Sequence, residues 1–199
     1  MTIRTLTSRE SDFAGRPRAV IITGPGFQDH DNIYCGYRLR EACFNVDFAT
    51  ADGAPVIGKY GTRVPLDKYS KPCISFDELD VDKFDLVVLT GGHEAPDRVR
   101  QDQRVKTFVH AMSSAGNLVA GLCHGPWVMI SSQIMSGRHA CAYPGLLDDM
   151  VHAGAIVADA DVVVDGNLVT CAYYGEVGMF MQTVIALAEE RASVSRVSA

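Results

Sequence analysis

Three short apolar segments constrain the fold of this chain more than any other feature. They are R-A-V-I-I-T (18–23), D-L-V-V-L-T (85–90) and N-L-V-A-G-L (117–122). Each is a continuous apolar run that ends at a glycine or a tight turn, which is typical of strands buried on both faces. Segments with helical periodicity follow, so strands alternate with helices about once every 30 residues. This alternation predicts one open α/β sandwich with a largely parallel sheet.

The remaining pattern sets the expected boundaries of the domain. Helices are predicted over 30–43, 98–115, 125–136 and 175–191, with strands over 44–50, 140–143, 162–164 and 167–172. The segment 51–75 is rich in Gly, Pro and Lys and predicts a loop or a small hairpin. We expect a flexible arm over 1–17, a single domain over 18–191 and a polar tail over 192–199.

Composition narrows the classes of function. The chain has 199 residues, of which 47% are hydrophobic, and a net charge of -6. Without a basic patch, neither nucleic acid nor an anionic membrane is an expected partner. The sequence has no apolar stretch of about 18 residues and no secretory signal pattern, so a cytoplasmic location is expected. Its six cysteines form no C-x-x-C pair and are expected to be reduced thiols, and no set of residues has metal-ligand spacing.

The carboxyl ends of parallel strands are where such sheets bind ligands. Three segments should converge there, namely 24–31, 91–97 and 121–126. The first, G-P-G-F-Q-D, resembles the start of a dinucleotide fingerprint. However, Asp29 replaces its third glycine and Pro25 removes a backbone N–H, so we expect no nucleotide and no other cofactor.

The third segment, Gly121-Leu122-Cys123-His124-Gly125, has the pattern of a nucleophile elbow. A thiol at a strand-to-helix turn lies at the positive end of a helix dipole, which predicts a pKa below its usual value of about 8.5. His124 would favour the thiolate or move protons. Backbone N–H groups near His124 and at Gly91-Gly92 would form an oxyanion pocket. The alternative is a buried thiol beside a hydrogen-bonded core imidazole.

Four motifs make the chain resemble a known family. They are L-T-G-G-H-E-A-P-D-R-V-R, A-G-L-C-H-G-P, Y-P-G-L-L-D-D-M-V-H-A-G-A and D-A-D-V-V-V-D-G-N-L-V-T, which begin at residues 89, 120, 143 and 159. In this order they resemble the ThiJ/PfpI superfamily, and its PfpI branch most closely. The similarity covers residues 18 to about 187.

The resemblance implies a flavodoxin-like three-layer sandwich of the class I glutamine amidotransferase type. It also implies a homodimer or a ring of dimers, with Cys123 as nucleophile and His124 beside it. In the PfpI branch a carboxylate after the Gly-Gly pair reaches a neighbouring subunit's histidine. Asp97 matches that position, although His93-Glu94 lengthens the loop by about one residue.

Two positions depart from the family pattern. Most members carry a glutamate after the first strand that hydrogen-bonds the nucleophilic sulfur, and an ungapped match places Gln28 there. An amide can donate a hydrogen bond but cannot transfer a proton at neutral pH, which argues against glyoxalase or deglycase chemistry. Proton transfer would then fall to His124, or to Asp29 or Asp31 if the loop is reset. Tyr173 and Tyr174 replace the family's usual Ser-Arg pair.

We therefore expect a cofactor-independent enzyme in which Cys123 attacks an electrophilic carbon of a small molecule, followed by hydrolysis or hydration. Gln28, His124 and Asp97 would complete its catalytic residues. The other pocket residues expected are Gly91, Gly92, His93, Glu94, Gly125, His30, Tyr173 and Tyr174. The alternatives are a glyoxalase, deglycase or peptidase of the general family type, and a redox sensor or chaperone without turnover.

Overall fold

The computed structural model describes residues 15–68 and 70–197, the last five of them as helix backbone only. Most of the arm predicted over 1–17 lies outside these residues. The central sheet has seven strands in the order β10-β11-β7-β6-β1-β2-β5. Their bounds are β10 (Val162–Asp165), β11 (Leu168–Cys171), β7 (Leu118–Leu122), β6 (Leu86–Leu89), β1 (Arg18–Ile22), β2 (Asn45–Thr50) and β5 (Ile74–Ser75).

Every neighbouring pair in this sheet is parallel except β10 with β11. The prediction of a mostly parallel sheet is therefore confirmed. The antiparallel edge strand follows directly from the chain, because only Gly166 and Asn167 join β10 to β11, and such a short connection allows only an antiparallel pair.

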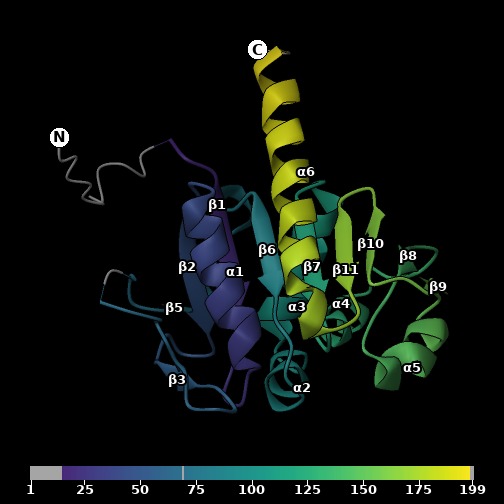
Figure 1. Ribbon diagram of the computed structural model, residues 1–199, viewed down its shortest axis with the longest axis horizontal. Coiled ribbons are helices and arrows are strands. Elements are labelled where there is room, and N and C mark those ends of the chain that lie inside the picture. Colours follow the sequence, from purple (N-terminus) through teal and green to yellow (C-terminus); the bar gives the residue numbers. More distant parts are fainter. Residues whose placement is uncertain (1–14, 69, 198–199) are drawn as a thin grey trace, which may run out of the picture.

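Helices cover both faces of the sheet and complete three layers (Figure 1). On one face lie α1 (Asp29–Glu41) and α6 (Val177–Val197), and on the other α3 (Gln103–Ser114) and α4 (Pro126–Ser131). Alternate residues of β1 pack on opposite faces of the sheet. Ile21 packs in the core beneath α1 and α6, and Val20 packs in the core beneath α3 and α4. This two-sided burial explains why the central strands are continuous apolar runs.

Shorter elements decorate the edges. A hairpin of β3 (Val56–Ile57) and β4 (Arg63–Val64) lies in the segment predicted as a loop or hairpin. The 3-10 helices η2 (Phe76–Glu78) and η3 (Val81–Lys83) lead into β6, and α2 (Glu94–Val99) follows it. Beyond α4 come β8 (His139–Ala140), η4 (Pro144–Leu146), α5 (Leu147–His152) and β9 (Ile156–Val157), and η5 (Tyr174–Glu176) precedes α6.

Three helix boundaries differ from the predictions. The helix expected over 98–115 is two helices, because Asp102 caps α3 by accepting a hydrogen bond from the Arg104 N–H at 2.9 Å. The helix expected over 125–136 ends at Ser131, and Gln133 has a positive φ of 59°.

The third difference is at the C-terminus, where α6 continues to Val197 through most of the predicted polar tail. No Gly or Pro occurs between residues 179 and 197 to end it. Among the described residues, no helix has the length and apolar character to cross a membrane.

Candidate active site

Cys123 occupies a strained turn at the carboxyl end of β7, directly before α4. Its φ is +58°, a conformation that costs an L-residue about 1–2 kcal/mol. The surrounding backbone holds it there, because the Cys123 N–H donates to the Cys171 carbonyl at 2.9 Å and its own carbonyl accepts from Tyr143 N–H at 3.1 Å. Any side chain on Gly125 would collide with the Leu89 carbonyl, so the turn requires glycine. The predicted elbow geometry is therefore confirmed.

His124 lies against the sulfur. Its Nδ1 is 3.3 Å from Cys123 Sγ. Its ring stacks on Tyr143 at a centroid distance of 4.5 Å, and the rings of Trp127 and His93 flank it at 5.2 and 5.9 Å. Trp127 is fixed in turn by its indole N–H, which donates to Asp149 Oδ2 at 2.7 Å.

Burial lowers the pKa of His124 to about 4, and the charges of His93 and Lys59 act in the same direction. The imidazole is therefore neutral at pH 7. A neutral ring can accept the thiol proton, but it offers no positive charge to stabilise a thiolate.

Asp31, and not Gln28, occupies the place beside the cysteine where the family glutamate was expected. The Gly91 N–H donates to Asp31 Oδ2 at 2.8 Å. A methyl group placed on Gly91 would lie 2.7 Å from Asp31 Oδ2 and 2.8 Å from Cys123 Cβ, so carboxylate and cysteine are separated only by this glycine. The side chain of Gln28 instead meets His30, with Nε2 3.1 Å from Nδ1.

The helix geometry explains why the ungapped match selected the wrong residue. Helix α1 begins at Asp29, with Gln28 at its N-cap. Asp31 therefore lies in the first turn, where side chains tilt back toward the helix N-terminus and so toward the strand ends. Gln28 is also buried, but in the turn that precedes the helix.

Burial raises the pKa of Asp31 to about 7, although the Gly91 hydrogen bond opposes this shift. Burial, followed by the Asp31 charge, also raises the pKa of the Cys123 thiol to about 12. The prediction of a depressed thiol pKa is therefore wrong. Cys123 as a residue is only 5% exposed, and desolvation of its thiol outweighs the dipole of the six-residue helix α4.

Two backbone amides face the sulfur. The N–H groups of His124 and Gly92 both act to lower the pKa of Cys123. The N–H of Gly91 is already used by Asp31. Gly92 has a φ of +90°, and a Cβ there would lie 2.5 Å from the Gln28 nitrogen. The N–H groups of His124 and Gly92, one from each of the segments 121–126 and 91–97, are therefore available as donors for the expected oxyanion pocket.

Two other predicted residues are exposed on α2 and have their hydrogen-bond partners on that helix and in the turn after it. Asp97 is exposed on α2, where Gln101 Nε2 donates to its carbonyl at 3.0 Å. Glu94 is exposed and pairs with Arg98 at 2.7 Å. An intersubunit contact of Asp97 with a histidine stays a prediction.

Several aromatic residues that are far apart in the sequence lie close to Cys123 and His124 in the fold. His30 stacks on Tyr174 at 5.3 Å, Tyr174 contacts Tyr173 at 4.2 Å, and Tyr173 approaches Tyr143 at 6.2 Å. The sequence analysis did not select Tyr143 or Trp127 as site residues. Trp127 meets His124 locally, since its backbone N–H donates to the His124 carbonyl at 3.1 Å, whereas Tyr143 begins one of the four motifs but reaches His124 only through the fold.

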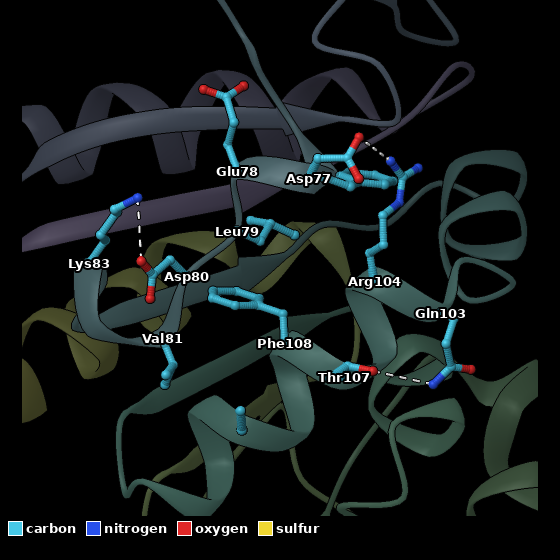
Figure 2. A pocket seen from close by; sticks show the side chains of 12 residues that line it. Asp77, Glu78, Leu79, Asp80, Val81, Lys83, Gln103, Arg104, Thr107 and Phe108 are labelled. Atoms are coloured by element: carbon cyan, nitrogen blue, oxygen red, sulfur yellow. Dashed lines mark hydrogen bonds and ion pairs between the residues drawn. The ribbon is translucent and has the colours of Figure 1, made fainter.

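A separate groove lies between η2, η3 and α3 (Figure 2). Its volume is about 670 Å³. Its charged groups pair with one another, as Arg104 does with Asp77 at 2.8 Å and Lys83 with Asp80 at 3.3 Å. It contains no cysteine or histidine. The residues around Cys123, rather than this groove, are therefore the candidate active site.

The fold and this site define a flavodoxin-like α/β protein with a cysteine at a nucleophile elbow. The model of the DJ-1/PfpI family matches residues 17–187. The chain belongs to the DJ-1/PfpI family, and the resemblance to its PfpI branch is confirmed.

Relatives and solved structures agree with this assignment. The chain is 37% identical over 170 residues to a deglycase of Pyrococcus abyssi, covering 85% of this chain and 98% of that protein. It is 35% identical to the deglycase PfpI of Pyrococcus furiosus over the same shares. The crystal structure of Drosophila melanogaster DJ-1beta superposes with a TM-score of 0.78 at 26% identity, over 92% of this chain and 96% of that one.

Proposed function

We propose that this protein is a cysteine-dependent enzyme that acts on the carbonyl carbon of a small molecule, with deglycation as the leading reaction. The observation that carries the proposal is the arrangement of three groups. Cys123 is held at φ +58°, His124 Nδ1 lies 3.3 Å from its sulfur, and the Asp31 carboxyl lies on the other side of Gly91.

Asp31 removes the objection that Gln28 raised. A carboxyl group with a pKa of about 7 can both give and take a proton near neutral pH. It is a stronger base than His124, whose pKa is about 4, and three units correspond to roughly 4 kcal/mol. We therefore assign the acid–base role to Asp31. His124, whose Nδ1 lies 3.3 Å from the sulfur, would only pass the proton to or from the Cys123 thiol.

In the proposed reaction, the Cys123 sulfur forms a bond to the carbonyl carbon as the thiol proton passes to Asp31 or His124. The former carbonyl oxygen gains negative charge, which the N–H groups of Gly92 and His124 are placed to stabilise. Asp31 then moves the proton of this carbon to the neighbouring keto carbon, which converts the hemithioacetal into the thioester of a 2-hydroxy acid with no external oxidant. Water attacks the thioester carbonyl, the sulfur–carbon bond breaks, the 2-hydroxy acid leaves, and the thiol recovers its proton.

Burial of the thiol argues against two alternatives. Because Cys123 is only 5% exposed, its sulfur is more accessible to a small electrophile than to an extended polypeptide, which disfavours a peptidase. A redox sensor requires a thiolate in the resting protein, whereas burial raises the pKa of Cys123 to about 12, and in the proposed reaction the thiol loses its proton only as it attacks the bound carbonyl group.

The test is release of lactate from methylglyoxal and from methylglyoxal adducts of amino acids. We expect turnover by the wild-type protein, its loss in Cys123→Ala and a fall of at least 100-fold in kcat for Asp31→Asn. The matched control is Cys43→Ala, which removes an exposed thiol just beyond the C-terminal end of α1 and should not change turnover. Equal turnover by Cys123→Ala and wild type would refute the proposal.

We also propose that Asp97 acts on His124 of a second subunit in a homodimer or ring of dimers. Its exposure on α2, the helix that follows His93, supports this role. Asp97→Asn should lower kcat about tenfold without changing the native mass. Unchanged kinetics would assign Asp97 to the surface.

A further inference from the structure

An aromatic row leads away from the cysteine, formed by Tyr143, Tyr173, Tyr174, His30 and Tyr60. Successive ring centroids are 6.2, 4.2, 5.3 and 6.2 Å apart. The row starts at Tyr143, which stacks on His124. It therefore begins beside the reacting sulfur and extends to the β3–β4 hairpin.

The row is assembled from segments far apart in the sequence, and each is fixed by its own hydrogen bonds. Asp29 accepts from the backbone N–H groups of Tyr60 and Thr62 at 2.8 and 2.7 Å, which holds the hairpin against α1. Gln28 holds His30 at 3.1 Å. Gln28 thus serves the row rather than the sulfur.

Part of this row is open to solvent in the described chain. Tyr173 is 40% exposed and Tyr60 is 66% exposed. A single exposed tyrosine is ordinary, but contiguous exposed rings that border a reactive group are characteristic of ligand sites. Ring contacts link Tyr173 to the sulfur, because Tyr173 lies 6.2 Å from Tyr143, Tyr143 stacks on His124 at 4.5 Å, and His124 Nδ1 is 3.3 Å from Cys123 Sγ.

Rings prefer planar aromatic partners in stacked or edge-to-face contact, and such pairs contribute about 0.5–1.5 kcal/mol beyond simple burial. We propose that Tyr173 and Tyr174 form a subsite for an aryl group attached to the reacting carbonyl, so that aromatic carbonyl compounds are the preferred substrate class. This inference rests on the proposed function, because it specifies the substrate of the same cysteine.

The experiment measures binding without turnover. Calorimetric titration of the Cys123→Ala protein with phenylglyoxylate and with pyruvate compares two α-keto acids that differ in the ring. We expect phenylglyoxylate to bind about tenfold more tightly, equivalent to about 1.4 kcal/mol. Adding Tyr173→Leu and Tyr174→Leu should reduce this advantage to about twofold while leaving pyruvate binding unchanged.

A matched control is Tyr37→Leu, which replaces an exposed tyrosine on α1 outside the row and should keep the tenfold preference. Equal binding of the two acids, or no phenylglyoxylate binding, would overturn the aryl subsite. The aryl subsite would also be overturned if the preference for phenylglyoxylate survived both tyrosine changes, even if those changes altered the native mass of the protein. The binding assay needs no turnover, so the two proposals can fail separately. Absence of the ring preference would not contradict the proposed carbonyl chemistry, and absence of lactate release would not contradict the binding result.

Discussion

The buried carboxyl of Asp31 should make the stability of this protein depend on pH in a specific direction. Asp31 has no exposed surface, and its pKa is raised from 3.8 to about 7. A shift of about three units corresponds to roughly 4 kcal/mol. Because the folded-state pKa is the higher one, this stabilisation is fully present below pH 3.8 and is lost as the pH rises through about 7.

Asp31→Asn isolates this contribution, because the amide keeps an oxygen to accept from Gly91 N–H but does not titrate. Urea unfolding of both proteins between pH 4.5 and 7.5 is the assay. The free energy of unfolding of the wild type, relative to the variant, should fall by roughly 3–4 kcal/mol over this range. His124, with its lowered pKa, loses stabilisation as the pH falls, but it is present in both proteins and cancels.

Asp29→Asn is the matched control at the same helix end. Although burial opposes it, hydrogen bonds from Tyr60 and Thr62 lower the pKa of Asp29. Its contribution is therefore lost only as the pH falls below about 3.8, outside the assay range. Parallel curves for wild type and Asp31→Asn would refute the raised pKa and, with it, the acid–base role.

Further predictions concern the thiol and its turn. At pH 7.5, iodoacetamide should label the exposed Cys43 before the buried Cys123, as followed by peptide mass spectrometry; labelling of Cys123 first would show that its pKa is not raised. Gly125→Ala should lower the free energy of unfolding by about 2–3 kcal/mol, because its Cβ meets the Leu89 carbonyl. Gly145→Ala, whose Cβ has 3.4 Å to the nearest atom, should change it by less than about 0.5 kcal/mol. Similar losses for the two alanine variants in urea unfolding would contradict the packing argument.

The architecture could be predicted because it depends on repeated local patterns. Buried parallel strands require continuous apolar runs, as in β1, β6 and β7, and the glycines around Cys123 mark a turn without space for side chains. The helix boundaries were harder to predict. A single cap, such as Asp102, divides a continuous periodic pattern into two helices.

The sequence alone determined the sandwich, the family and the placement of Cys123 and His124 at a strained corner, since adjacent residues and glycine spacing specify these features. Only the tertiary structure decided which carboxyl faces the thiol, how both groups titrate, and which rings surround them. Proton affinity depends on desolvation and on neighbours from distant segments. Asp31 lies beside Cys123 across Gly91 only because three strand ends come together in the fold. The spacing of these residues along the sequence does not indicate that contact.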